Sequence, residues 1–192
     1  MTCLALVSAC SKSPTAPSPQ PTSNVPQPPT PAPSAVVPTA PAMGYQKTTV
    51  SVTGDPQHYV ARGRVITLTK ENATFDIQMW NGGGYLYVSM TTTDSRTNWA
   101  FRVASPHNGT APIVPGIYET AQDPLSAAEI FDFYGDGNGC NQATARLIIH
   151  SIDFDPVTLK LRNFRGSFSN HHCEGSSPVM QGEIAILEDV TR

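Results

Sequence analysis

Polar and apolar residues alternate along most of the chain after Met43, as they do in β-strands with one buried face. The alternation is complete over residues 48–53 and 75–79 and partial over residues 60–68. Seven further segments have strand character, namely residues 85–90, 99–103, 117–120, 129–134, 144–152, 159–168 and 180–187. The pattern therefore predicts about ten strands.

Turn residues separate several of these segments. Residues 70–72 read Lys-Glu-Asn, residues 81–84 read Asn-Gly-Gly-Gly, and residues 153–156 read Asp-Phe-Asp-Pro. Asn and Gly accept the positive φ that tight hairpins require. The one short helical pattern covers residues 123–128. Short strands at this spacing predict an all-β fold, an antiparallel sandwich or barrel of about ten strands.

The first part of the chain has a different composition. Residues 14–41 hold 11 of the 18 prolines, and residues 13–46 contain no charged side chain. Proline fixes φ and removes a backbone donor, so this segment favours extended polyproline II and cannot build a core. At about 3.1 Å per residue it could reach roughly 85 Å. We interpret it as a disordered tether, with a PxxP-type ligand as the alternative.

The ten N-terminal residues end in Val7-Ser8-Ala9-Cys10, which resembles the lipobox of bacterial lipoproteins. The resemblance implies that Cys10 carries lipid and becomes the first residue of the mature protein, and acyl chains on one cysteine anchor a protein stably to a membrane. Only nine residues precede Cys10 and none is basic, which is short for a signal peptide. We therefore divide the chain into a signal-peptide remnant (1–9), a lipidated cysteine with its linker (10–42) and a β-domain (43–192).

Charge and hydropathy exclude two classes of function. Charged residues make up 14% of the chain and the formal net charge is −3, so there is no basic stripe to neutralise phosphates. Nucleic acid is therefore not an expected partner. No run of 18 or more apolar residues occurs in the sequence, which excludes a membrane-spanning helix in these 192 residues.

Two cysteines, Cys140 and Cys173, belong to the β-domain. An even pair in an exported protein is most simply a disulfide, and closing this loop would stabilise the fold by roughly 3–4 kcal/mol. The alternative is a zinc site, because two thiolates and two imidazoles suit Zn²⁺. Its ligands would come from the two cysteines together with His150, His171, His172 and Glu174. The usual CxxC or HxxxH spacing is missing, so we expect the disulfide and no metal or other cofactor.

The segment from Phe131 to Cys140 contains Asp132, Asp136 and Asn138, whose oxygens could bind Ca²⁺ in a short loop. The EF-hand template fails, because counting from Asp136 its glycine position is Asn141 and its glutamate position is Leu147. The alternative is a glycine-rich turn in which Asp and Asn bond to their own backbone.

Motifs for catalysis are sparse. The sequence has no GxSxG and no HExxH, and a depressed-pKa catalytic cysteine is disfavoured in an oxidising compartment. A secreted hydrolase would have to use side chains near His171, His172 and Glu174. On an extended strand His172 and Glu174 point to one face and His171 and Cys173 to the other. We therefore expect no catalytic residue.

Aromatic residues offer one further candidate surface. Tyr85 and Tyr87 share one face of a strand, while Trp80 and Trp99 lie beside the neighbouring turns and strands, so a stacking surface for a sugar or a peptide is an option. We favour the alternative that these rings fill the core and cross-strand pairs.

Two motifs carry a resemblance to a family: Gly139-Cys140-Asn141 before a long strand, and His-Cys-Glu-Gly at 172–175 followed by Pro178 and Gln-Gly-Glu-Ile at 181–184. They resemble an uncharacterised domain of exported and lipid-anchored proteins of soil bacteria. The likeness continues through residues 59–63 and 115–118. The spacing from Phe168 to His172 is one residue longer than in that family. The resemblance implies export, paired cysteines and an all-β domain, and no known activity.

These features together predict a lipid-anchored protein of the cell envelope, at the outer membrane or cell surface rather than in the cytoplasm. Its partners would be the membrane, through the lipid on Cys10, and an unknown protein or glycan. A binding or structural role is favoured over an enzymatic one. The alternatives are the secreted hydrolase and a Ca²⁺-dependent adhesion module.

Overall fold

The computed structural model describes residues 47–119, 130–174 and 177–188, and these form ten strands in two antiparallel sheets. The six-stranded sheet has the order β2-β1-β10-β9-β8-β6, and the four-stranded sheet has the order β3-β4-β5-β7. In chain order the elements are β1 (Thr49–Gly54), β2 (Val65–Thr69), β3 (Ala73–Trp80), η1 (Asn81–Gly83), β4 (Tyr85–Thr92), β5 (Asn98–Ala104), α1 (Pro106–Gly109), β6 (Gly116–Glu119), β7 (Phe131–Gly135), β8 (Ala143–Phe154), β9 (Leu161–Cys173) and β10 (Met180–Leu187). The prediction of an all-β fold of about ten strands is confirmed.

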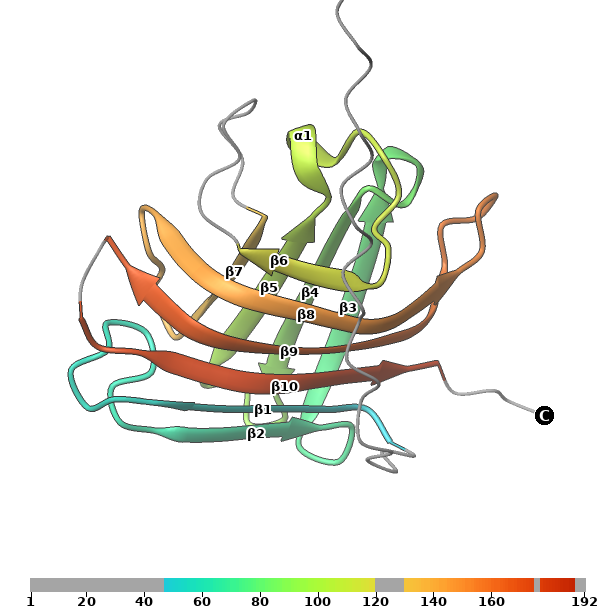
Figure 1. The fold of residues 1–192 in the computed structure, drawn as a ribbon. Coiled ribbons are helices and arrows are strands. Elements are labelled where there is room, and N and C mark those ends of the chain that lie inside the picture. Colours follow the sequence, from blue (N-terminus) through green and yellow to red (C-terminus); the bar gives the residue numbers. More distant parts are fainter. Residues whose placement is uncertain (1–46, 120–129, 175–176, 189–192) are drawn as a thin grey trace, which may run out of the picture. The chain divides into compact units, whose positions relative to one another are not determined.

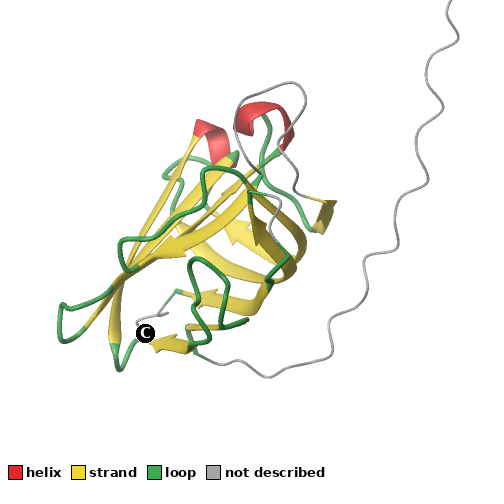
Figure 2. Cartoon of the chain, turned by 90° about the vertical axis from the view of Figure 1, so that its left-hand side faces the viewer, coloured by secondary structure: helices red, strands yellow, loops and turns green. Residues whose placement is uncertain are grey.

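The two sheets pack face to face, and their strands cross instead of running alongside one another (Figure 1). The six-stranded sheet curves around the four-stranded one, and Figure 2 shows the same layers from the side. Such a crossed arrangement brings the ends of strands from one sheet over the edges of the other. The edge strand β7 of the smaller sheet therefore lies close to β8 of the larger sheet.

Alternation along the strands builds the core. In β4 the buried residues are Leu86, Val88 and Met90, and the half-buried residues that alternate with them, on the outer face, are Tyr85, Tyr87 and Ser89. Aromatic rings join the two layers: the Phe131 and Phe168 centroids lie 4.8 Å apart, and those of Phe101 and Phe164 lie 6.0 Å apart. The buried side chains from both sheets form one continuous cluster, as expected for a single domain core.

The second strand begins later than its sequence pattern predicts. Strand character extends from Val60, but residues 55–64 form a compact loop and β2 starts only at Val65. The loop closes on itself through backbone bonds from His58 and Gly63 to the carbonyl of Asp55. Val60 and Ala61 are fully buried there, so their apolar character reflects packing of a loop and not a strand.

Strand β9 contains a bulge between Phe168 and His171. Phe168 pairs with Gly182, and His171 pairs with Met180. An advance of three residues along β9 therefore corresponds to two residues along β10. Asn170 carries the irregularity with φ of 52°. A bulge inverts the alternation beyond it. The extra residue therefore turns His171 and Cys173 inward, next to Phe168.

Cys10, the tether and the predicted helical segment 123–128 lie outside the described residues. Within the described residues, no helix has the length and hydrophobicity needed to cross a membrane.

Candidate functional site

A disulfide fixes the loop between β7 and β8. Cys140 and Cys173 are bonded, with their Cα atoms 5.0 Å apart, which confirms the predicted pair. Next to it, the backbone N–H and side-chain amide of Asn141 both donate to Glu174 Oε1, at 3.2 Å and 2.5 Å. Two fixed points thus hold the start of β8 to the end of β9, and Glu174 serves in loop attachment.

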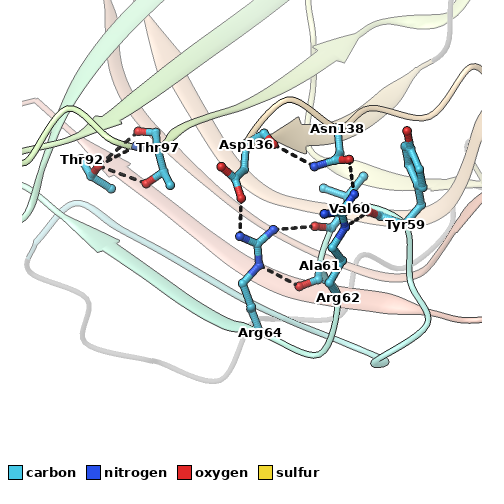
Figure 3. Close-up of polar contacts among 9 residues, drawn as sticks. All are labelled: Tyr59, Val60, Ala61, Arg62, Arg64, Thr92, Thr97, Asp136 and Asn138. Atoms are coloured by element: carbon cyan, nitrogen blue, oxygen red, sulfur yellow. Dashed lines mark hydrogen bonds and ion pairs between the residues drawn. The ribbon is translucent and has the colours of Figure 1, made fainter.

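Two arginines of the 55–64 loop hold the other side of the β7–β8 loop (Figure 3). Arg64 Nη1 donates to Asp136 Oδ2 at 2.5 Å, and Arg62 Nη2 donates to Asn138 Oδ1 at 2.5 Å. Arg64 also donates to the carbonyls of Val60 and Ala61, at 3.1 Å each. Its guanidinium lies 4.8 Å from the centroid of the Trp99 ring, which adds a cation–π contact. Arg64 is therefore the main connection between the two loops.

Beneath these loops three buried side chains form a hydrogen-bonded chain, the His58–His171–Asp132 relay. His171 Nε2 lies 3.2 Å from Asp132 Oδ1, and His171 Nδ1 lies 3.3 Å from His58 Nε2. Their exposed fractions are 1% for His58, 0% for His171 and 4% for Asp132. Arg102 Nη2, 4.0 Å from Asp132 Oδ2, supplies a positive charge near the carboxylate. The relay thus connects the 55–64 loop, β9 and β7.

The surroundings of His58 decide which nitrogens carry protons. The backbone N–H groups of Val60 and Ala61 both point at His58 Nδ1, at 3.2 Å each, so this nitrogen is an acceptor. His58 Nε2 then carries the proton and donates to the His171 carbonyl at 3.2 Å and toward His171 Nδ1. His171 Nε2 in turn donates to Asp132. Burial, followed by the neighbouring His171, lowers the pKa of His58 below its usual 6.5, as a neutral ring requires.

Two overlapping sets of metal-ligand types surround the relay: His58, His171 and Cys173, and Asp132, Cys140 and His171, with ligand atoms within 4.8 Å of one another. Both sets include a cysteine of the disulfide, which offers no thiolate. The Nδ1 lone pair of His58 is already taken by two N–H groups. The oxidised protein therefore lacks the donors that the zinc alternative requires at these positions.

The other predicted site residues do not converge. His171 is buried, His172 is half-buried and Glu174 is exposed, on alternating faces as their spacing predicts. Asp132 faces His171, whereas Asp136 and Asn138 face the two arginines. One oxygen of each of these three side chains thus accepts a hydrogen bond from the protein. His150, the last of the zinc candidates, lies 3.3 Å from Ser167 Oγ, on the outer face of the larger sheet.

The outer face of the four-stranded sheet carries an aromatic groove, which we call the Tyr87–Tyr134 groove. Its cavity measures about 360 Å³. The lining residues come from β4, β5, β7 and the β7–β8 loop: Tyr87, Asn98, Trp99, Ala100, Tyr134, Gly135, Gly137, Asn138 and Gly139. Tyr87 and Tyr134 are half-buried, with ring centroids 6.5 Å apart and planes tilted by 38°. The two tyrosine rings therefore form the aromatic surface of this groove.

The groove depends on the glycines of its rim. A Cβ at Gly135 would lie 2.5 Å from the carbonyl oxygen of Asn98, so only glycine lets the end of β7 pass so close to β5. Asn138, on the same rim, accepts the bond from Arg62. The loop that forms one wall is therefore held by Arg62, Arg64 and the disulfide, and the wall is preorganised.

Sequence reasoning found part of this region. Tyr85 and Tyr87 do share one face, Trp80 stacks on its cross-strand partner Tyr85 at 4.6 Å, and Trp99 is buried, as the core-and-pair interpretation predicts. That reasoning missed Tyr134, which lies two strands away from Tyr87, and His58, a single histidine in a loop with no recognisable motif. Alternation in 131–134 could have placed Tyr134 on the outer face, but not beside Tyr87.

Comparison of the chain with protein-family models, with curated proteins and with solved structures gives no match.

Proposed function

We propose that this chain is a lipid-anchored protein of the cell envelope that presents its β-domain, at the end of a proline-rich tether, to bind a ligand. The anchor would be the lipid on Cys10, and the tether would be residues 14–41. The proposed ligand site is the Tyr87–Tyr134 groove. In this role the disulfide stabilises the presented domain outside the reducing cytoplasm.

The observation that carries the binding role is the construction of the groove. Concave sites that bind small groups combine aromatic surface with a few fixed polar groups and are largely formed before the ligand arrives. The Tyr87–Tyr134 groove has the aromatic surface, the amide of Asn98, and a wall fixed by two arginines and a disulfide.

Burial of the relay supports binding over hydrolysis. A general acid or base must reach the group whose proton it transfers. The side chains of His58, His171 and Asp132 are at most 5% exposed and bond to one another or to backbone. Their arrangement suits a structural connection between the sheets.

The anchor is tested by labelling the full chain with an alkyne-bearing fatty acid in a bacterial host. We expect incorporation of the label into the wild type and its loss in Cys10→Ala. The matched control is Cys3→Ala, which removes the other N-terminal cysteine and should keep the label because Cys3 precedes the lipobox cysteine. Label retained in Cys10→Ala, or absent from the wild type, would refute the anchor.

A further inference from the structure

We infer that the Tyr87–Tyr134 groove binds an uncharged carbohydrate. This inference rests on the proposed binding function and names the chemical class of its ligand. It follows from three properties of the groove: the charge of its lining, the geometry of its aromatic pair, and the polar groups at its rim.

The lining is electrically neutral. None of the nine lining residues is Asp, Glu, Lys, Arg or His. The nearest row of the sheet holds Arg102, paired across the strands with both Tyr87 and Asp132. Arg102 and Asp132 carry opposite charges 4.0 Å apart, so they largely cancel at the groove. Two arginines border the groove, but Arg64 is paired with Asp136 and Arg62 donates to Asn138. A charged ligand would find no counter-charge in the lining itself, whereas a neutral sugar needs none.

The aromatic pair offers apolar surface of the kind that a sugar ring covers. The C–H faces of a pyranose are apolar and pack on aromatic rings, while its hydroxyl groups point sideways. The rings of Tyr87 and Tyr134 both line the groove, with their planes tilted by 38° and their centroids 6.5 Å apart. Ala100 lies on β5, between the strands of the two tyrosines, and its short side chain is 3% exposed. Because Ala100 is so small, the two larger rings extend further from the sheet than it does.

The polar groups around this pair can bond to sugar hydroxyls. Burial, followed by a hydrogen bond to Tyr87, raises the pKa of Tyr134, so its hydroxyl remains protonated. A tyrosine hydroxyl can both donate and accept, so this pair can bond to the hydroxyl groups of a ligand. The Asn98 residue is exposed and its side-chain amide offers both a donor and an acceptor. In the neighbouring β7–β8 loop, Gly137 and Gly139 are exposed and leave backbone accessible.

An extended peptide is the main competing occupant, and the geometry disfavours it. Peptides commonly bind by adding a strand to a sheet edge, where unpaired backbone groups are available. Tyr87 and Ala100 lie on β4 and β5, the two inner strands of this sheet, whose backbones pair with neighbours on both sides. Tyr134 and Gly135 lie on the edge strand β7, but the N–H and the carbonyl of Gly135 are already bonded to Asn138. The groove therefore offers mainly side chains and loop backbone to a ligand.

The test uses the full chain carrying Cys10→Ala, so that the result does not depend on the anchor. The probes are cellohexaose, chitohexaose, maltohexaose and xylohexaose, titrated by calorimetry and by the fluorescence of Trp99 and Trp80. We expect at least one of them to bind. Tyr87→Ala and Tyr134→Ala should each weaken that binding by about tenfold or more, since each removes one stacking surface worth about 1.4 kcal/mol. Tyr134→Phe, which keeps the ring, should weaken it less.

The matched control is Tyr85→Ala. This residue is also a half-buried tyrosine on the outer face of β4, but it stacks on Trp80 and does not line the groove. Its replacement should leave affinity unchanged. Thermal unfolding of each variant separates loss of a contact from loss of the fold.

Two results would overturn the inference. One is that no probe binds at millimolar concentration, and the other is that binding persists unchanged in the stable Tyr87→Ala and Tyr134→Ala variants. Cosedimentation with bacterial envelope fragments then distinguishes this failure from failure of the proposed function. Binding lost after protease treatment of the fragments, but not after periodate oxidation of their sugars, would identify a protein ligand and refute the carbohydrate. No binding to any fragment would refute both proposals.

Discussion

His171 on β9 donates a hydrogen bond to Asp132 on β7 across 3.2 Å, and this buried bond joins a strand of one sheet to a strand of the other. The two residues are 39 positions apart in the chain. A carboxylate that is 4% exposed requires such partners, because an unpaired buried charge is costly. The bond is therefore a structural connection, and its energetics can be measured.

Removal of one relay partner should destabilise the fold strongly. In His171→Ala the Asp132 carboxylate loses its closest donor and His58 loses an acceptor, so we expect a loss of about 3 kcal/mol in the free energy of unfolding. Urea denaturation measures this loss. His172→Ala is the control: it alters the next residue of β9 on the opposite face and should cost under about 1 kcal/mol. Equal losses in the two variants would contradict the relay.

Stability should fall on mild acidification because of His58. Its pKa is lowered in the folded protein, so below the unfolded value of 6.5 the unfolded state binds more protons than the folded state. The stability contribution of the neutral ring is thus complete above 6.5 and decreases as pH falls toward the folded pKa. Comparing unfolding free energies at a series of pH values in wild type and His58→Gln checks this: the wild type should lose more stability than the variant. Parallel profiles would refute the assignment.

Arg64 should matter more to stability than Arg62, although both hold the same loop. Arg64→Ala removes two backbone contacts, the Asp136 pair and the contact with Trp99, for an expected loss of about 1–2 kcal/mol. Arg62→Ala serves as the matched comparison, since its bonds are exposed, and it should cost under about 1 kcal/mol. The denaturant midpoints of the two variants show which arginine contributes more to stability. A lower midpoint for Arg62→Ala than for Arg64→Ala would show that Arg64 is not the main connection between the two loops.

Reduction of the disulfide should loosen the groove wall as well as the fold. The closed loop spans 33 positions, and its chain entropy corresponds to roughly 3–4 kcal/mol of stability. We expect the Cys140→Ala, Cys173→Ala double variant to unfold at lower denaturant and to exchange the amide protons of residues 136–139 faster. Hydrogen exchange by mass spectrometry provides the second readout. Unchanged exchange in this segment would show that the arginines alone hold the wall.

The bulge in β9 should depend on the positive φ of Asn170. Asn and Gly adopt this conformation readily, whereas β-branched residues do not. Asn170→Gly should therefore unfold within about 0.5 kcal/mol of the wild type, and Asn170→Val should lose about 1–3 kcal/mol. Thermal or urea unfolding of the two variants compares them. A stable Asn170→Val variant would show that the bulge tolerates other backbone geometries.

Local patterns in the sequence determined much of the fold. Alternation with period two places Leu86 inside and Tyr87 outside whatever the topology, because successive side chains of a strand point to opposite faces. Turn residues such as Asn81 and its glycines end strands by local chemistry. The Cys140–Cys173 pair also followed from counting, since the β-domain holds two cysteines.

Only the tertiary structure decided the sites. Tyr87 and Tyr134 share a groove because β5 lies between β4 and β7, and His58 meets His171 because the 55–64 loop folds over the end of β9. The first contact depends on the strand order of the sheet and the second on the conformation of a loop. Packing of the whole core sets both, and neither produces a periodic pattern in the sequence. The bulge at Asn170 places His171 and not His172 in the interior. That selection needed the pairing register, which no single strand specifies.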